Sequence, residues 1–498
     1  MFALALWDRQ EQTLFLARDR MGEKPLYYGW QNETLLFASE LKALRAHPDF
    51  KNEIDRAVLP LYLRHGYIPA PWSIYKGIRK LLPGTWISFS AKDRDQVPEP
   101  KPFWSLTDVV LRGQSNPFNG SEDDAVNELE RLLNQSIAGQ RLADVPLGAF
   151  LSGGVDSSTV AALMQAQSSQ PVKTFTIGFD DAGYNEAEHA RAVAKHLGTD
   201  HTELYVNADQ AQQIIPQMPQ IYDEPFGDSS GIPTYLVSQL ARAHVTVSLS
   251  GDGGDELIGG YSRYSGFQRW QRRTASVPFT LRSLLSKGLC CIPDIHNTRH
   301  QRRLALLRGV LKAKHPAALY RALFGHWLPE DNAVQNPEEA LYWMTDRALS
   351  LHLNEPLDHA LLADMMTYLP DDILVKVDRA AMAASLETRV PLLDYRIVEW
   401  SWTLPQHLKA RGGHQKWVLR ELLYRYVPKA LMERPKMGFG VPISEWLRGP
   451  LRDWTEDLLE PQTMQQDGFL NPVPIQKKWR EHLSGANHWE YHLWDVLM

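Results

Sequence analysis

One stretch decides the fold of this chain: Val145-Pro-Leu-Gly-Ala-Phe-Leu-Ser-Gly-Gly-Val-Asp-Ser-Ser-Thr159. Its first half is an apolar run of strand length, its middle is a serine and glycine turn, and residues 159–164 suit a helix. Such a turn aims backbone N–H groups and the positive end of a helix dipole at one point. It therefore predicts a phosphate or pyrophosphate site, and Asp156 beside that anion implies a bridging Mg²⁺.

The residues that follow alternate between strand and helix patterns. Strands are expected at 172–177, 202–206 and 245–249, and helices at 185–197 and 232–243. This alternation predicts an α/β fold with a doubly wound parallel sheet. Ligands of such sheets bind at the carboxyl ends of the strands, where Ser152, Gly178 and Ser250 fall.

A second glycine loop, Ser250-Gly-Asp-Gly-Gly-Asp-Glu256, follows the strand at 245–249. Its clustered carboxylates repel one another unless a cation or a proton lies between them, so an acid of this loop and Asp156 can share one Mg²⁺ on a triphosphate. Either loop alone could be a surface turn. The chain has no lysine-containing Walker pattern, and this favours pyrophosphate as a leaving group and adenylation of a substrate.

The flanking regions differ from this centre. Residues 1–90 contain short apolar runs at 2–7, 13–17, 25–28, 34–38 and 81–89, which predict part of a β-sandwich. Residues 91–120 are expected to be a linker or wrapped loop, and Ser121 with Asp124 predicts a capping box at the start of a helix. Residues 265–498 are expected to be mostly helical, for example at 281–285, 302–311, 317–323, 342–351 and 417–426, with breaks at prolines such as Pro370.

Composition excludes several classes of protein. The 498 residues carry a net charge of −6, which argues against nucleic acid as the main partner. No apolar run approaches the roughly 18 residues of a membrane span, and the first residues do not resemble a signal peptide. The two cysteines are adjacent, at 290 and 291, which fits a reducing compartment. We therefore expect a cytoplasmic protein with no membrane partner.

Four motifs together resemble those of the glutamine-hydrolysing asparagine synthetase family, and the similarity spans essentially the whole chain. The motifs are Ser-Gly-Gly-Val-Asp-Ser-Ser at 152–158, which is similar to the PP-loop of ATP pyrophosphatases, Tyr-Asp-Glu-Pro-Phe-Gly-Asp-Ser-Ser at 222–230, the glycine loop at 250–256, and Glu-Thr-Arg-Val-Pro-Leu-Leu-Asp at 387–394. The resemblance implies a partial glutamine amidotransferase domain of the N-terminal-nucleophile type at 1–105. A linker at 106–120 and an ATP-dependent synthetase domain at 121–498 would follow.

The resemblance also implies a reaction and its residues. Aspartate would react with ATP to give β-aspartyl-AMP and pyrophosphate, and ammonia would then form asparagine. Pyrophosphate would be held by Ser152, Gly153, Gly154, Ser157 and Ser158. Mg²⁺ would be held by Asp156 and Asp255, and the nucleotide by Leu151, Ile177, Ser250 and Gly251. Asp252, Lys436 and Arg389 would be catalytic, and Asp228 and Asp372 would bind the acid substrate.

This chain departs from the family pattern at two places. Many members have Glu where Asp252 stands, so the suggested base for ammonia has a shorter reach here. The family's glutaminase begins with a cysteine nucleophile, whereas residues 1–8 resemble a strand well inside that domain. We therefore expect a truncated glutaminase that uses free ammonia rather than glutamine; a start upstream of Met1 is an equal alternative.

Three other readings stay open at this point. The acceptor could be another carboxylate, such as a sugar uronate of a surface polysaccharide. The chain could be a non-catalytic relic or regulatory partner, although its retained acids count against this. A PP-loop enzyme acting on tRNA or citrulline fits the acidic charge poorly. A homodimer is one assembly that the resemblance allows.

Overall fold

A parallel sheet of five strands lies at the centre of the computed structural model, which describes residues 1–90, 97–179, 186–290, 298–336, 338–345, 351, 353–433 and 440–498. The strands are β8 (Leu147–Phe150), β9 (Lys173–Phe179), β10 (Asp200–Val206), β11 (Val247–Leu249) and β12 (Glu387–Arg389). Their order is β10-β9-β8-β11-β12, and all neighbours are parallel. The order reverses between β8 and β11, as in a doubly wound sheet. The strand β12 has no counterpart in the sequence prediction.

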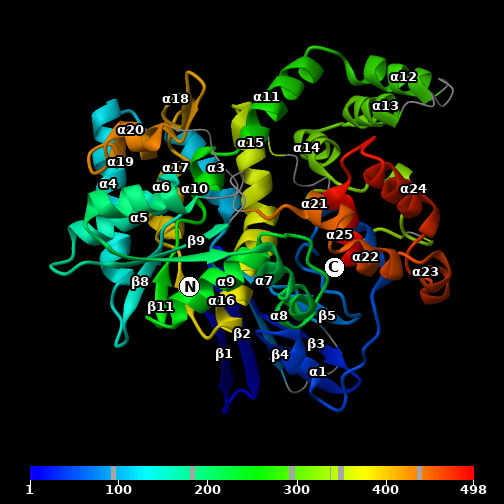
Figure 1. Cartoon of the computed structure of the whole chain (residues 1–498), viewed down its shortest axis with the longest axis horizontal. Coiled ribbons are helices and arrows are strands. Elements are labelled where there is room, and N and C mark those ends of the chain that lie inside the picture. Colours follow the sequence, from blue (N-terminus) through cyan, green and yellow to red (C-terminus); the bar gives the residue numbers. More distant parts are fainter. Residues whose placement is uncertain are drawn as a thin grey trace.

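Helices cover both faces of this sheet. Figure 1 shows α5 (Val155–Ala166) and α6 (Ala187–Leu197) above β9, and α9 (Gly231–Arg242) and α16 (Leu374–Ala383) below it. Nearly all of β9 and all of β11 are buried. Because both faces are covered, these strands are apolar runs without alternation, as the sequence predicts.

One long helical segment crosses the molecule beneath the sheet. It runs from α15 (Pro356–Ala363) through a π-helical stretch, η5 (Asp364–Ile373), into α16, and Pro370 lies inside it. The expectation that Pro370 breaks the helix is therefore wrong, because the wider π-type turns accommodate the missing N–H group. This segment presents Asp364, Tyr368, Asp372 and Lys376 at intervals of four residues.

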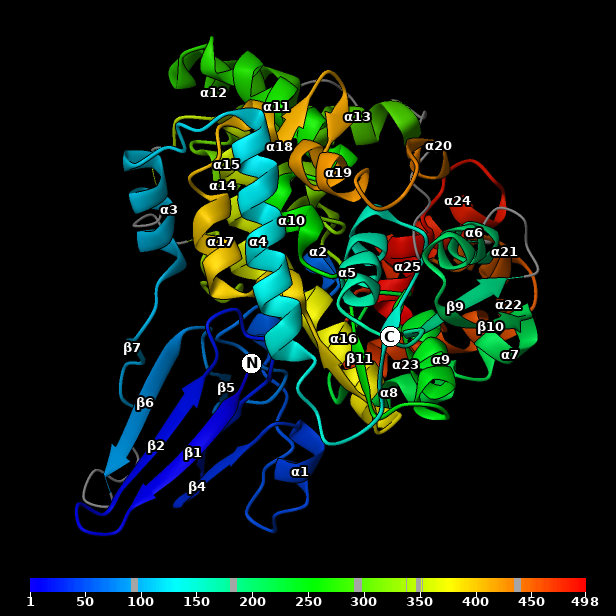
Figure 2. The ribbon, with the colours of Figure 1, turned by 90° about the vertical axis from the view of Figure 1, so that its left-hand side faces the viewer.

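The N-terminal region contains two antiparallel sheets, which confirms the β-rich prediction. One has the order β1 (Ala3–Asp8), β2 (Thr13–Arg18), β6 (Thr85–Ser90) and β7 (Lys101–Pro102); the other has the order β4 (Thr34–Ala38), β3 (Tyr27–Gln31) and β5 (Ile78–Lys80). Figure 2 shows both sheets at the foot of the molecule. A small core lies between them: Leu16, Leu26, Tyr28, Leu81, Ile87 and Phe89.

The sheet β4-β3-β5 also shares a core with the synthetase region. Tyr27, Leu36 and Leu41 belong to the same buried cluster as Phe175 of β9 and Trp494 of α25 (Glu490–Leu497). A buried ion pair joins Lys80 to Glu224 at 2.6 Å across this boundary. The N-terminal sheets are therefore continuous with the rest of the molecule.

The expected linker is partly regular. Residues 106–115 form helix α3 (Leu106–Ser115), in which Leu106, Val109 and Val110 are buried. The expectation of an irregular connection is wrong there, because those apolar side chains pack into a core. Helix α4 (Glu122–Gln140) begins with the predicted capping box of Ser121 and Asp124.

The remaining chain is mostly helical, as predicted. Its other helices, with the short hairpin β13 (Ala410–Arg411) and β14 (His414–Gln415), are α1 (Leu41–Arg45), α2 (Leu59–His65), α7 (Ala208–Gln212), α8 (Met218–Tyr222), α10 (Gly254–Ile258), α11 (Ser262–Ala275), α12 (Phe279–Cys290), α13 (Thr298–Lys312), α14 (Pro316–Phe324), α17 (Tyr395–Ser401), α18 (Gln406–Lys409), α19 (Trp417–Leu423), α20 (Lys429–Met432), α21 (Ile443–Arg448), α22 (Arg452–Leu458), α23 (Pro461–Asp467) and α24 (Pro472–Leu483). The helix predicted at 342–351 is not formed at 342–345, which include a turn, and 346–350 lie outside the described residues.

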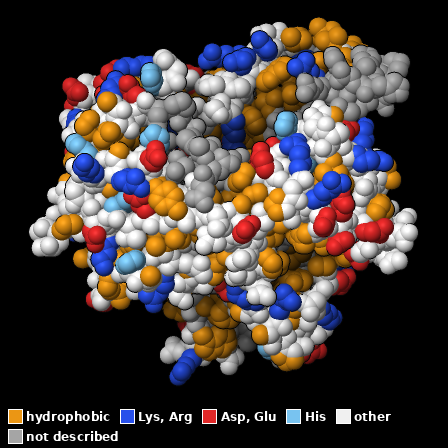
Figure 3. Space-filling view, in the orientation of Figure 1, with side chains coloured by type: hydrophobic (Ala, Val, Ile, Leu, Met, Phe, Trp, Pro, Cys, Tyr) orange, Lys and Arg blue, Asp and Glu red, His pale blue; other side chains and the backbone are white. Residues whose placement is uncertain are grey.

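Two surface properties bear on partners. Figure 3 shows acidic and basic side chains interspersed over one face, with apolar side chains between them. Within the described ranges, every helix is too short or too polar to cross a lipid bilayer.

Candidate active site

A cavity of about 530 Å³ opens at the carboxyl ends of β8, β9 and β11. It is lined by most of the residues predicted for nucleotide, metal and substrate: Leu151, Ser152, Gly153, Gly154, Asp156, Ser157, Ile177, Asp228, Ser250, Gly251, Asp252 and Asp255. The structure therefore brings together two loops that are almost a hundred residues apart in the sequence.

The serine loop closes tightly on the first turn of α5. Ser152 Oγ lies 2.9 Å from Ser157 Oγ, and the backbone N–H of Ser152 donates to the same Ser157 oxygen at 3.1 Å. Gly153 has a φ of 71°, and a Cβ there would lie 2.8 Å from the backbone nitrogen of Ala190. The loop thus requires glycine, and it faces the N-terminal end of a helix, where anions are stabilised.

Ser158 is the one member of this loop that does not reach the cavity. Its side chain is fully buried, and it is absent from the described cavity wall. The alternation of α5 explains this, because successive helical residues point in different directions.

The acidic loop lies directly against the serine loop. A Cβ at Gly251 would come within 2.5 Å of the backbone nitrogen of Ser157, and a Cβ at Gly254 within 2.4 Å of Asp156 Oδ1. Close approach of the two backbones, rather than turn geometry alone, therefore explains these glycines.

Lys416 joins the two loops, and no sequence motif pointed to it. Its Nζ is 2.8 Å from Asp255 Oδ1 and is also paired with Asp156 Oδ2. Burial disfavours its charge, but the two carboxylates outweigh burial and raise the pKa of Lys416. The residue precedes α19 in a left-handed conformation, with a φ of 56°, which is strained for a residue other than glycine.

The acid pair fits Mg²⁺. Both carboxylates reach one ammonium nitrogen, so their oxygens converge on one point. Over the described residues, no group of three or more His, Cys, Asp or Glu side chains is arranged to hold a metal. Mg²⁺ commonly uses one or two carboxylates and takes its other ligands from phosphates and water, so a pair is a suitable donor set.

A second charged group in the wall of the same cavity lies around Lys376 of α16. Its Nζ is 2.9 Å from both Asp228 Oδ2 and Ser230 Oγ. Burial favours the neutral form of Asp228, yet Lys376 and hydrogen bonds from Ser230 lower its pKa overall. Burial and the nearby charge of Asp228 raise the pKa of Asp372 far above its ordinary value. Burial also raises the pKa of Asp252, against the attraction of Lys376.

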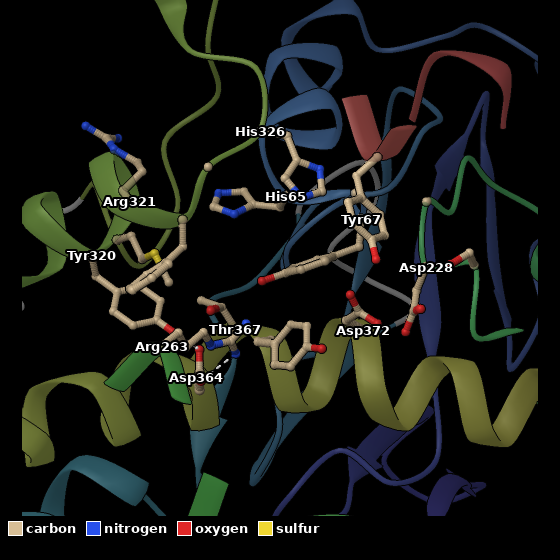
Figure 4. A pocket seen from close by; sticks show the side chains of 18 residues that line it. His65, Tyr67, Asp228, Arg263, Tyr320, Arg321, His326, Asp364, Thr367 and Asp372 are labelled. Carbon is tan, nitrogen blue, oxygen red and sulfur yellow. Dashed lines mark hydrogen bonds and ion pairs between the residues drawn. The ribbon is translucent and has the colours of Figure 1, made fainter. Parts of the chain in front are cut away.

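A smaller cavity of about 190 Å³ adjoins this group. It shares Asp228, Ser229, Tyr368 and Tyr491 with the larger cavity. Figure 4 shows Asp228 and Asp372 facing each other at one side of it. The imidazoles of His65 and His326 line its upper wall in that view. Of the predicted substrate residues, Asp228 thus lines both cavities, whereas Asp372 lines only the smaller one.

One predicted catalytic residue, Arg389, is not brought to this place. Arg389 bonds to Glu387 at 2.7 Å and to the carbonyl oxygens of Gln140 and Leu142, and it does not line the described cavity. These contacts anchor β12 to the end of α4. Lys436 lies outside the described residues.

Comparison with known proteins agrees with this site. The asparagine synthase family profile matches residues 128–498, and that of the glutamine amidotransferase domain matches residues 1–104. "Asparagine synthetase (glutamine-hydrolyzing) 1" of Bacillus subtilis is 30% identical, over 100% of this chain and 76% of its own length. "Asparagine synthetase (glutamine-hydrolyzing) 3" of the same organism is 27% identical, over 90% of this chain and 69% of its own.

Among solved structures, NAD+ synthetase from Burkholderia pseudomallei matches 52% of this chain and 91% of its own. The identity is 14% and the TM-score is 0.23, so the structural similarity is weak. The family assignment rests on the sequence matches and on the two loops that meet at the cavity. The chain belongs to the glutamine-hydrolysing asparagine synthetase family of carbon–nitrogen ligases.

Proposed function

We propose that this chain activates aspartate as β-aspartyl-AMP, releases pyrophosphate, and forms asparagine with ammonia. One observation carries the proposal: the serine loop, Asp156 and Asp255 line the same cavity as Asp228, Asp252 and Lys376. Groups suited to a triphosphate and groups suited to a charged acid therefore share one space.

The serine loop is suited to the leaving group. Ser152, Gly153, Gly154 and Ser157 lie around the N-terminal end of α5, whose dipole and N–H groups stabilise pyrophosphate as it departs. Mg²⁺ bound by Asp156 and Asp255 would neutralise phosphate charge. Leu151 and Ile177 supply apolar wall on the same side, which suits the nucleoside.

The group of charged residues around Lys376 is suited to a zwitterionic acid. Lys376 offers a positive charge, and Asp228, whose pKa is lowered, offers a negative one beside it. An amino acid with a side-chain carboxylate needs both signs of charge. In the first step a carboxylate oxygen attacks the α-phosphorus, the bond from that phosphorus to the bridging oxygen breaks, and pyrophosphate leaves.

Asp252 is the base that we propose for the second step. The nitrogen of ammonia attacks the acyl carbon, the bond from that carbon to the AMP oxygen breaks, and Asp252 accepts a proton from nitrogen. Its raised pKa brings its basicity closer to the working pH, which favours general-base catalysis. The shorter side chain of Asp252 still reaches the cavity wall.

We propose free ammonia as the nitrogen donor for these 498 residues. The region that matches the glutamine amidotransferase domain contains no cysteine, because both cysteines lie at 290 and 291. Glutamate release from glutamine, measured without ammonium salts, tests this point: thiol-dependent release would contradict it.

Product analysis tests the proposed reaction. The chain is incubated with ATP, Mg²⁺, aspartate and ammonium chloride, and the nucleotide products are separated by chromatography. We expect AMP, pyrophosphate and asparagine in equal amounts, with no pyrophosphate when aspartate is omitted. Formation of ADP and phosphate, or no aspartate-dependent turnover, would refute the proposal.

A further inference from the structure

The ammonium group of Lys416 lies at the point that a metal shared by Asp156 and Asp255 would have to occupy. It is 2.8 Å from Asp255 Oδ1 and paired with Asp156 Oδ2, and the lysine side chain is almost entirely buried. Two carboxylates that close together repel each other without a cation between them. Lys416 supplies that cation from within the chain.

The packing around Lys416 leaves little room for both cations at once. A Cβ at Gly260 would lie 1.9 Å from Asp255 Oδ1 and 1.9 Å from Lys416 Cε, so backbone closes one side of the pair. A Cβ at Gly254 would lie 2.4 Å from Asp156 Oδ1, so backbone also approaches from the second loop. A divalent cation bridging both acids would have to displace the ammonium group.

Displacement requires a new anionic partner for Lys416. The lysine lines the same cavity as Ser152, Gly153 and Ser157, so its side chain can turn toward a phosphate held there. Its left-handed backbone is held by its neighbours at some cost in strain, as is common for residues with a functional constraint. A triphosphate is the ligand that offers both a partner for the lysine and ligands for the metal.

We propose that Lys416 and Mg²⁺ compete for this one pair of carboxylates, so that the metal binds only together with a triphosphate. Lys416 thus acts as an internal counter-ion that neutralises the charge of Asp156 and Asp255 until the nucleotide binds. The inference rests on the proposed function only in taking Mg²⁺ as the cation. It concerns the order of binding, and Lys416 is a positioning residue in it.

Metal binding without nucleotide tests this inference. MgCl₂ alone is titrated into the full chain and into K416M, and binding is followed by calorimetry and by the thermal unfolding midpoint. We expect no saturable binding to the unchanged chain. K416M removes the ammonium group from the acid pair, so its Mg²⁺ binding should become saturable, at least about tenfold tighter than the weakest binding that the titration detects, and it should unfold at a higher temperature when Mg²⁺ is present.

Two further variants control this experiment. K416R keeps a cation between the acids and should behave like the unchanged chain. K416M combined with D255N should lose the binding that K416M gained. Should K416M fail to fold, K416Q is a second uncharged replacement for the same titration.

Either of two results would overturn the inference. One is tight binding of Mg²⁺ alone to the unchanged chain that is lost in D255N. The other is a folded K416M or K416Q that gains no affinity for Mg²⁺. Neither measurement needs aspartate or turnover, so the proposed reaction could fail while this inference stands, and the reverse also holds.

Discussion

The cavity at the ends of β8 and β11 buries charge, whereas the outer N-terminal sheet exposes apolar side chains. Lys416, in the wall of that cavity, is about 95% buried and lies against Asp255. Asp372, which lines the smaller adjoining cavity, is buried to a similar extent beside the charge of Asp228. In β1, Leu4 and Leu6 are about half exposed. Both are unusual, because charges are normally outside and large apolar residues inside.

The difference separates two kinds of sequence constraint. Buried charges are costly unless they are paired, so the cavity residues are held in place for chemistry rather than for stability. The N-terminal sheets are held by a core that they share with the synthetase region, through residues such as Tyr27 and Phe175. Changes in the cavity should therefore reduce activity, and changes at the shared core should reduce stability.

The largest expected effect comes from the acid pair. Asp255→Asn or Asp156→Asn removes a proposed metal ligand, and we expect pyrophosphate release to fall by about 10²–10³-fold with the fold intact. Glu128→Gln is the matched control, since Glu128 forms a surface ion pair with the exposed Arg131 one turn away. Full activity in Asp255→Asn would show that this buried carboxylate is not needed for the reaction.

Gly260→Ala tests the same wall by steric means. The added Cβ would overlap both Asp255 Oδ1 and Lys416 Cε, so we expect about a 10²-fold loss of activity from misplaced groups. Gly266→Ala in α11 is the control, because a Cβ there meets open space and alanine favours a helix. Equal activity of the two variants would show that the packing around Lys416 is not critical.

Lys80→Met addresses the other side of the comparison. Lys80 is buried and pairs with Glu224 at 2.6 Å, so its loss leaves a buried carboxylate and should cost about 3–5 kcal/mol of stability. Lys76→Met is the control, since Lys76 and Glu53 form an exposed pair, and we expect no measurable change. Denaturant unfolding measures the free energy of unfolding of both variants. Equal values for Lys80→Met and Lys76→Met would contradict this prediction.

The pH dependence of stability gives a smaller effect. Burial, and then Asp255, raises the pKa of Glu256 from its ordinary 4.5 to about 7. Between these values the unfolded chain releases a proton that the folded chain retains, so stability falls as pH rises through this window. Glu256→Gln removes that loss and should be more stable than the unchanged chain by about 1–3 kcal/mol above pH 7. Thermal melts from pH 5 to 8 measure this difference. The same pH dependence of the unfolding midpoint in the unchanged chain and in Glu256→Gln would contradict the prediction.

The smallest effect is expected at β1. Leu6→Thr replaces a half-exposed leucine with a β-branched residue that suits a strand, and the free energy of unfolding should stay within about 0.5 kcal/mol of its original value. Leu16→Ala in β2 is the buried counterpart and should cost about 2–5 kcal/mol. A large loss in Leu6→Thr would show that the exposed face of β1 is covered in solution.

Local patterns predicted the parts of the fold that depend on local physics. The apolar run before Ser152 and the capping box of Ser121 are set by neighbours in the sequence, and the structure confirms the strand β8 and helix α4. Helix α3 was not predicted, although Leu106, Val109 and Val110 stand at helical spacing, because the segment is short and lies between proline- and glycine-rich stretches.

Long-range contacts could not be predicted in the same way. Lys416 is one lysine before an apolar helix, and nothing near it in the sequence points to Asp156 or Asp255. The strand β12 has only three residues and is recognisable only by its pairing with β11. Arg389 shows the converse: its motif suggested catalysis, while its contacts tie β12 to α4.

The central claim is that the acid passes through an acyl-adenylate, and transfer of oxygen tests it most directly. Aspartate labelled with ¹⁸O in its β-carboxylate is incubated with the chain, ATP, Mg²⁺ and ammonium, and AMP is examined by mass spectrometry. If the acyl-adenylate forms, one labelled oxygen appears in the phosphate of AMP for each asparagine formed. Unlabelled AMP, or label recovered in inorganic phosphate, would contradict it.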